Sequence, residues 1–254
     1  MIDALILAGE DFERKGLGVS VKALVEIHGK PMVYYVIDAL KKSGIIGKIV
    51  MVGPSKILYP LFHDQIDCII DGKQSMLDNV FEGMQHLGVE RKVLISTSDI
   101  PMLTSECIND FVVQAEQVNA DLCYPIVDKA VNDLRFSGIE RTYTKMKEGT
   151  FTGGNLFYVN PLIVNKCCSK AQQLINHRKN VLKMAQILGW KTLFLLFTKK
   201  LSIQYAEERF SRIFDIKAKA IISTFPELAN DVDKISDLNF VKEYLSIGHN
   251  LEEY

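Results

Sequence analysis

The segment Ile2-Asp3-Ala4-Leu5-Ile6-Leu7-Ala8-Gly9 decides the fold, because its apolar run ends at a glycine and a polar loop follows it. The loop continues to Val21 with glycines and basic residues, and the chain becomes apolar again at Ala23-Leu24-Val25. A strand followed by a glycine-containing loop of this size is typical of a site that encloses phosphate groups. We therefore expect a nucleotide-binding loop directly after the first strand.

A helix and a second strand follow this loop. Beyond Pro31, apolar residues recur every three or four positions as far as Leu40, which predicts a helix with proline in its first turn. Ser43-Gly44 ends the helix, and residues 49–53 are apolar enough for a buried strand. Together these elements form a βαβ unit, in which ligands bind beyond the carboxyl ends of the strands.

The alternation continues and predicts an α/β fold with a mostly parallel central sheet flanked by helices on both faces. Residues 129–149 interrupt it, being charged and turn-prone, and we expect an inserted arm over a pocket there. We expect one domain over residues 1–254, with nucleotide binding in about 1–128 and the arm and C-terminal part in about 129–254. Further strands are expected at 67–70, 92–97, 120–125, 142–144, 156–159, 190–197 and 218–223, and further helices near 59–62 and at 76–87, 104–118, 160–190 (two), 202–214 and 235–245.

Composition excludes several classes of protein. With 30 basic and 31 acidic residues the chain has no broad positive field for nucleic acid, and 48% apolar residues suffice for a large core. The five cysteines are odd in number and lack metal-binding spacing, which favours reduced thiols. No signal-peptide pattern is present and no apolar run approaches eighteen residues, so we expect a cytoplasmic protein without membrane contact.

Several polar residues stand where strands meet loops, and these are the candidates for chemistry. Asp99 precedes Pro101 at the end of a strand, and Asp231 and Asp233 lie late in the chain. Magnesium binds through one or two carboxylates with phosphate oxygens and water, so these acids are candidate ligands. Taken singly, an Asp-x-Pro is a common turn, Lys22 a surface lysine and Ser75 a helix cap. Their coincidence at junctions with Gly9 favours one shared edge of the sheet.

These motifs together resemble the MobA-like nucleotidyltransferases. The resemblance rests on four short segments in the right order along nearly the whole chain. They are Leu7-Ala8-Gly9, Lys22-Ala23-Leu24 with Gly29-Lys30-Pro31-Met32, Ser98-Asp99-Ile100-Pro101, and Asp231-Val232-Asp233-Lys234-Ile235-Ser236-Asp237-Leu238.

The resemblance implies a glycosyltransferase-A-like Rossmann variant that transfers a nucleoside monophosphate from a triphosphate to a small-molecule acceptor with a phosphate or hydroxyl group, releasing pyrophosphate. It implies Mg²⁺ as the cofactor and no nucleic-acid partner, and it allows a homo-oligomer. The implied roles are catalysis by Lys22 and Asp99, nucleotide binding by Leu7, Ala8, Gly9, Arg14, Lys22, Gly72 and Ser75, acceptor binding by Gly153, Gly154 and Asn155, and metal binding by Asp99, Asp231 and Asp233.

One departure from the family pattern falls in the first loop. Glu10-Asp11-Phe12-Glu13-Arg14 replaces the usual second glycine and its Gly-Thr-Arg-Met-like continuation, and its acidic residues would repel a triphosphate. Two alternatives therefore stay open: a glycosyltransferase that uses sugar nucleotides, and a regulatory protein that binds a nucleotide without turnover. The sequence does not choose the acceptor or the base among CTP, GTP, UTP and ATP.

Overall fold

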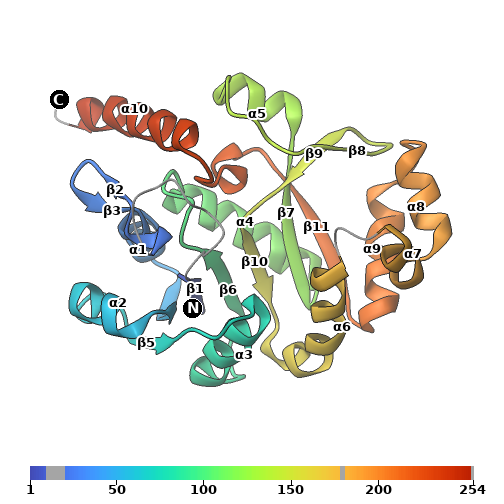
Figure 1. Cartoon of the computed structure of the whole chain (residues 1–254), viewed down its shortest axis with the longest axis horizontal. Coiled ribbons are helices and arrows are strands. Elements are labelled where there is room, and N and C mark those ends of the chain that lie inside the picture. Colours follow the sequence, from blue (N-terminus) through green and yellow to red (C-terminus); the bar gives the residue numbers. More distant parts are fainter. Residues whose placement is uncertain (10–20, 178–180, 253–254) are drawn as a thin grey trace.

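The computed structural model describes residues 1–9, 21–177 and 181–252 of the chain. Within these residues, nine strands form one sheet in the order β5-β4-β1-β6-β10-β7-β9-β8, with β11 beside β7 (Figure 1). Its strands are β1 (Ile2–Leu7), β4 (Ile46–Gly53), β5 (Cys68–Asp71), β6 (Val93–Thr97), β7 (Leu122–Asp128), β8 (Thr144–Lys145), β9 (Thr150–Gly153), β10 (Leu156–Val159) and β11 (Ala218–Ser223), and β2 (Glu26–Ile27) pairs with β3 (Lys30–Pro31) in a separate ribbon.

The first half of the sheet is parallel and sets the position of the ligand edge. Strands β5, β4, β1 and β6 run in the same direction, and their register places Leu7 opposite Val52 on one side and Thr97 on the other. The loops that follow these strands therefore leave the sheet at one level. Strand β10 is antiparallel to β6 and β7, whereas β11 is parallel to β7. The sheet as a whole is therefore mixed, and its first half has the parallel arrangement that the alternation of strands and helices predicts.

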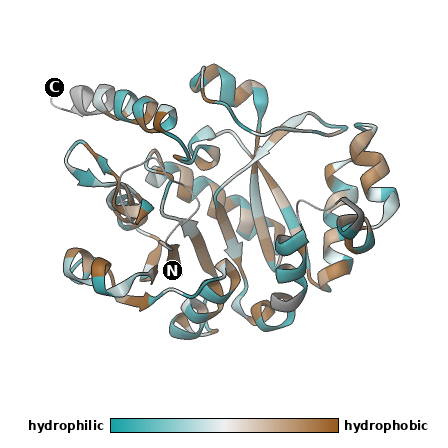
Figure 2. Cartoon of the chain, in the orientation of Figure 1, coloured by the Kyte–Doolittle hydropathy of each residue, from teal (hydrophilic) through white to brown (hydrophobic). Residues whose placement is uncertain are grey.

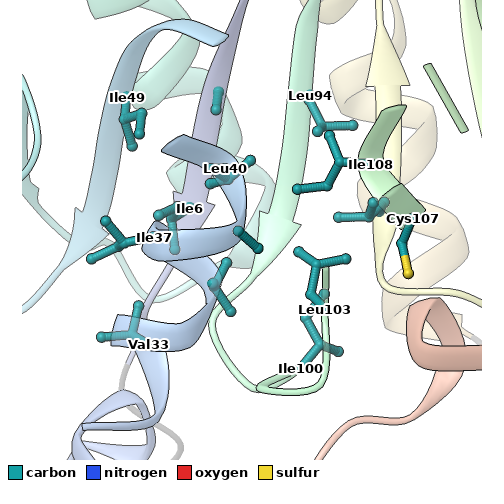
Figure 3. Close-up of a cluster of buried hydrophobic side chains, with 14 of the residues drawn as sticks. Ile6, Val33, Ile37, Leu40, Ile49, Leu94, Ile100, Leu103, Cys107 and Ile108 are labelled. Carbon is teal, nitrogen blue, oxygen red and sulfur yellow. The ribbon is translucent and has the colours of Figure 1, made fainter. Parts of the chain in front are cut away.

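Helices cover both faces of this sheet because successive residues of a strand point to opposite sides. On β1, Ile6 packs in the cluster with Val33 of α1 and Ile108 of α4 (Figure 3), and Leu5 packs on the other face against Met84 of α3. The helices are α1 (Met32–Lys42), α2 (Ser55–Phe62), α3 (Met76–Leu87), α4 (Ser105–Val118), α5 (Lys129–Arg135), α6 (Val164–His177), α7 (Val181–Leu188), α8 (Trp190–Phe197), α9 (Ile203–Phe214) and α10 (Ile235–Glu252), with 3-10 turns η1 (Lys22–Leu24), η2 (Pro161–Ile163) and η3 (Pro226–Ala229).

The prediction of a strand at 190–197 is wrong, because these residues form helix α8. A short apolar run does not distinguish a buried strand from a helix unless its exposed positions are known. In the structure Leu193 is buried while Phe194 and Phe197 are exposed, a pattern of helical rather than alternating period. None of the helices in the described residues is long and apolar enough to cross a bilayer.

The region after β7 also contains more regular structure than predicted. Asp128 caps helix α5 inside the expected irregular arm by accepting a hydrogen bond from the Ala130 amide. Residues 150–153, where no strand is predicted, form strand β9, and of the strand expected at 142–144 only Thr144 belongs to a strand, the two-residue β8. Helix α10 continues past its predicted end at 245 to Glu252.

Candidate functional site

A cleft of about 860 Å³ opens over the carboxyl ends of β1, β4, β5 and β6, which is the edge that the βαβ pattern predicts. Its volume lies in the range of small-molecule and cofactor sites. Its walls are formed by residues between positions 7 and 99, which lie within the part of the chain that is predicted to bind the nucleotide. They are Leu7, Gly9, Lys22, Gly53, Pro54, Asp71, Gly72, Lys73, Gln74, Met76, Asn79, Thr97, Ser98 and Asp99.

The floor of the cleft depends on the close approach of two backbone segments, the residue after β1 and the end of β4. The Ala8 amide donates to the Val52 carbonyl at 2.8 Å, and a Cβ atom at Gly53 would lie 2.4 Å from the Ala8 oxygen. Any larger residue at position 53 would therefore push β1 and β4 apart. Leu7, Gly9 and Gly72 line the cleft, and their contact with a nucleotide stays a prediction, while Ala8 is fully buried and shapes the backbone.

Lys22 reaches into the cleft from the 3-10 turn η1, which buried Ala23 anchors to the core. Its Nζ atom forms an ion pair with the Asp99 carboxylate and another with Asp233 Oδ1 at 3.0 Å. Only 9% of the lysine side chain is exposed. Lys22 is thus a mostly buried cation held between two acids, not the solvated surface lysine that was the plain alternative.

Asp231 and Asp233 reach Asp99 because the backbone brings the two segments together. The Val232 amide donates to the Asp99 carbonyl at 2.9 Å. Val232 stands between Asp231 and Asp233 in the sequence, and its side chain is fully buried. Asp237 accepts a hydrogen bond from the Asp233 amide at 3.0 Å, which fixes the entry to α10. One carboxylate oxygen from each of Asp99, Asp231 and Asp233 lies within 4.8 Å of the others.

The chemistry of this acidic triad, Asp99, Asp231 and Asp233, fits a hard divalent cation. Oδ1 of Asp99 is buried and has no hydrogen-bond partner in the described part of the chain. Burial, and next the charge of Asp99, raise the pKa of Asp231, because neighbouring carboxylates resist sharing a site as anions. Oxygen ligands at this spacing are what Mg²⁺ prefers, and Lys22 supplies positive charge to the triad.

Two residues that the sequence analysis did not select belong to the site. Arg141 comes from the arm, is 13% exposed in its side chain, and forms an ion pair with Asp231. Asn79 of α3 is buried in the cleft wall, where its Oδ1 atom accepts from the Lys73 amide at 2.5 Å. A polar residue inside the apolar stripe of α3 was a signal for Asn79, whereas nothing local in sequence distinguishes Arg141 from other charges of the arm.

Ser75 stands at the N-terminus of α3, as predicted, and its hydroxyl is engaged in two hydrogen bonds. It accepts from the Asp78 amide at 3.2 Å and donates to Gln172 of α6 at 2.8 Å. Its neighbours Gln74 and Met76 line the cleft. The structure thus confirms the cap, and a contact of Ser75 with the nucleotide stays a prediction. Arg14 lies outside the described residues.

The Gly153-Gly154-Asn155 segment begins at the last residue of β9 and leads to β10, next to η3. The Gly154 amide donates to Pro125 and the Asn155 amide to Leu228, each at 2.8 Å. A Cβ atom at Gly153 would lie 2.0 Å from the Tyr124 hydroxyl, so a larger residue there would require the tyrosine ring to move. These contacts show a packed backbone junction, and the role of the segment in acceptor binding stays a prediction.

The fold and the cleft define a class: α/β proteins that bind a ligand at the carboxyl edge of a mainly parallel sheet, here with a carboxylate triad beside a lysine. The pattern of the MobA-like NTP transferase domain matches residues 4–189. The chain belongs to this family.

A curated relative and a solved structure that are similar to this chain agree with this assignment. A 2-C-methyl-D-erythritol 4-phosphate cytidylyltransferase of Clostridium perfringens is 29% identical over 124 residues, which cover 46% of this chain and 55% of the relative. The chain thus spans about half the length of the curated relatives it matches. A structure titled as a hypothetical transferase from Thermus thermophilus is 35% identical with a TM-score of 0.82, covering 94% of this chain and all of that one.

A CMP:2-keto-3-deoxy-manno-octonic acid synthetase, solved with CTP, superimposes with a TM-score of 0.64 over 97% of this chain and 99% of its own. At 10% identity that likeness concerns the fold alone.

Proposed function

We propose that this chain is a Mg²⁺-dependent nucleotidyltransferase that moves a nucleoside monophosphate from a triphosphate to a phosphate- or hydroxyl-bearing small molecule. The observation that carries the proposal is the convergence of Lys22 with the acidic triad beside a cleft of nucleotide size. Four charged groups from three distant segments converge at the edge where α/β sheets bind ligands. Membership of the MobA-like family supports the same activity.

In the proposed reaction an acceptor oxygen forms a bond to the α-phosphorus while the bond to the departing pyrophosphate breaks. The chain's task is to position the reactants and stabilise charge, so no protein nucleophile is required. Asp99, Asp231 and Asp233 would hold Mg²⁺, which neutralises charge on the triphosphate when bound. Lys22 would exchange its carboxylate partners for phosphate oxygens, and Gly9 and Gly72 let the backbone approach the ligand closely.

The acceptor side of the site would lie on the arm. A second cleft of about 730 Å³ is lined by Lys129, Arg141, Tyr143 and other arm residues and shares Asp233 with the triad. The lining carries charges of both signs, which suits a small polar acceptor. The proposal that Gly153, Gly154 and Asn155 contact the acceptor rests on the family resemblance. We take the arm and the sheet together as the glycosyltransferase-A-like arrangement that the family resemblance implies.

CTP is the first triphosphate to test, because the curated relatives are cytidylyltransferases. The experiment has two stages. Each of the four triphosphates with Mg²⁺ is first screened for a rise in melting temperature, since a ligand that binds only the folded state stabilises it. The triphosphate that stabilises most is then incubated with acceptors, beginning with 2-C-methyl-D-erythritol 4-phosphate, and pyrophosphate release is measured.

The expected result is stabilisation by one triphosphate and pyrophosphate release that Asp99→Asn abolishes and the exposed control Asp64→Asn leaves unchanged. Stabilisation without release from any acceptor would favour the regulatory alternative. Consumption of a sugar nucleotide in place of a triphosphate would favour a glycosyltransferase.

A further inference from the structure

Helix α8 presents an aromatic face at the edge of the molecule, far from α1 and α2 (Figure 1). Trp190, Phe194 and Phe197 are 64%, 66% and 71% exposed, and their spacing of four and three residues puts them on one side of the helix. Thr192, on the opposite side, is 7% exposed, and its neighbour Leu193 is 8% exposed, so this side of the helix packs into the protein. Single exposed apolar residues are ordinary, but three large aromatic side chains on one face form a surface that needs a partner.

The sequence segment that contains this aromatic face carries charge of one sign. Residues 164–200, which include α6, α7 and α8, contain eight basic residues and no acidic one, although acids slightly outnumber bases in the whole chain. Lys191, Lys199 and Lys200 lie within or directly after α8 and are exposed. A partner that covers the aromatic face therefore also meets positive charge.

The neighbouring helix α9 contributes acids, but they have partners of their own. Glu207 forms an ion pair with Lys219 at 2.6 Å, and Glu208 forms one with Arg212 at 3.3 Å. Lys191 lies over the ring of Tyr205, with Nζ 5.5 Å from the centroid. The positive charge beside α8 thus has little local compensation from α9.

We propose that α8 docks this protein on the surface of a membrane that contains anionic phospholipid. Aromatic side chains favour the boundary between headgroups and acyl chains, and lysines beside them are attracted to lipid phosphates. A second copy of the chain would bring the two basic surfaces together, so charge favours the lipid surface. In the hydropathy view the ribbon of α8 lies at the rim of the molecule and is coloured largely as apolar (Figure 2).

This proposal departs from the sequence-based expectation of no membrane contact. That expectation rested on the length needed to span a bilayer, and α8 has eight residues. Peripheral docking needs only a short apolar face and adjacent cations. The proposal is independent of the nucleotidyltransferase assignment, because none of the α8 side chains lines the nucleotide cleft or the arm cleft.

Trp190 makes the test direct, because it is the chain's single tryptophan. The full-length protein is titrated with vesicles of phosphatidylcholine alone or with added phosphatidylglycerol, and tryptophan emission and co-sedimentation are followed. We expect a blue shift and sedimentation only with the anionic vesicles, reversed by high salt. Each lysine near an anionic surface is worth a factor of roughly five in binding, so Lys191→Gln/Lys199→Gln/Lys200→Gln should bind about a hundredfold more weakly.

A matched pair of variants separates the aromatic face from general stickiness. Phe194→Ser/Phe197→Ser keeps the tryptophan reporter and should lose vesicle binding, whereas Tyr59→Ser/Leu134→Ser, at sites 58% and 90% exposed, should bind like the parent. Equal binding to neutral vesicles, or none to anionic ones, would overturn the proposal. A blue shift that grows with protein concentration in the absence of vesicles would overturn it in favour of self-association.

Discussion

Lys22 and Arg141 offset the charge of three carboxylates that stand close together in a partly buried site. Lys22 forms ion pairs with Asp99 and Asp233, and Arg141 forms one with Asp231. Each cation comes from a different segment, so the protein itself offsets part of the negative charge of the triad. A bound polyphosphate with its metal would have to exchange these ion pairs for new ones, which makes both cations sensitive positions for substitution.

Lys22→Gln should lower turnover by about a hundredfold or more, because one preorganised charge donor is lost from the phosphate site. Pyrophosphate release by purified variant and parent, with CTP and the acceptor found in the screen, measures the effect. Lys30→Gln, an exposed lysine of the β3 strand, is the matched control and should keep parental activity. Parental turnover in Lys22→Gln would remove the lysine from the mechanism.

Cys107 and Cys123, both fully buried, should be inert in the native protein. Burial raises the pKa of Cys107 to about 12 and that of Cys123 to about 11, so almost no reactive thiolate is present at neutral pH. Mass spectrometry after brief iodoacetamide treatment should find both unmodified until the protein is unfolded in urea. Rapid native labelling of either residue would show that the core around α4 and β7 opens easily.

At the scale of elements, prediction from sequence succeeds where one period dominates a segment. The crossover helix from 32 was predicted because Val33, Val36 and Ile37 repeat at helical spacing and all three pack on the sheet. Residues 190–197 were mistaken for a strand because nearly every position is apolar, so exposure, which sequence does not give, decides between the two structures. In the arm, α5 was missed because this seven-residue helix buries only Asn132, so its sequence shows no apolar stripe and its stability depends on tertiary packing.

Ser75 allows a test at the same scale, because its hydroxyl joins α3 to α6. Ser75→Ala should lower the free energy of unfolding by about 1 kcal/mol through loss of the cap on α3. Urea denaturation measures this, with Thr104→Ala, the cap of α4, as a comparison of the same kind. The affinity of Ser75→Ala for the triphosphate then decides whether the hydroxyl also contacts the base, and an unchanged unfolding energy would contradict the cap.

At the scale of the molecule, the sequence predicts the part of the site that follows directly from the parallel strands. Leu7 and Thr97 end β1 and β6 at one level, with Val52 of β4 beside Leu7, so Gly9 and Asp99 had to meet at one edge. The arrival of Asp231 and Asp233 followed from the family resemblance and depends on one backbone hydrogen bond from Val232 to Asp99. Arg141 was missed because its place follows from how the arm folds back over the sheet, a long-range contact that no local pattern encodes.

The arm is therefore expected to be linked to the metal site through Arg141. In Arg141→Gln the Asp231 carboxylate loses its cation in a mostly buried position, which should cost about 3 kcal/mol of stability without metal. Added Mg²⁺ should restore part of that loss, since the ion supplies positive charge to the same carboxylates, so the melting temperature should rise more in the variant than in the parent. Scanning fluorimetry with and without Mg²⁺ measures both effects, and Arg212→Gln, which breaks an exposed pair with Glu208, should change neither by more than about 1 kcal/mol. An equal Mg²⁺ response in Arg141→Gln and the parent would separate the arm from the triad, and the acceptor would then have to be sought elsewhere on the molecule.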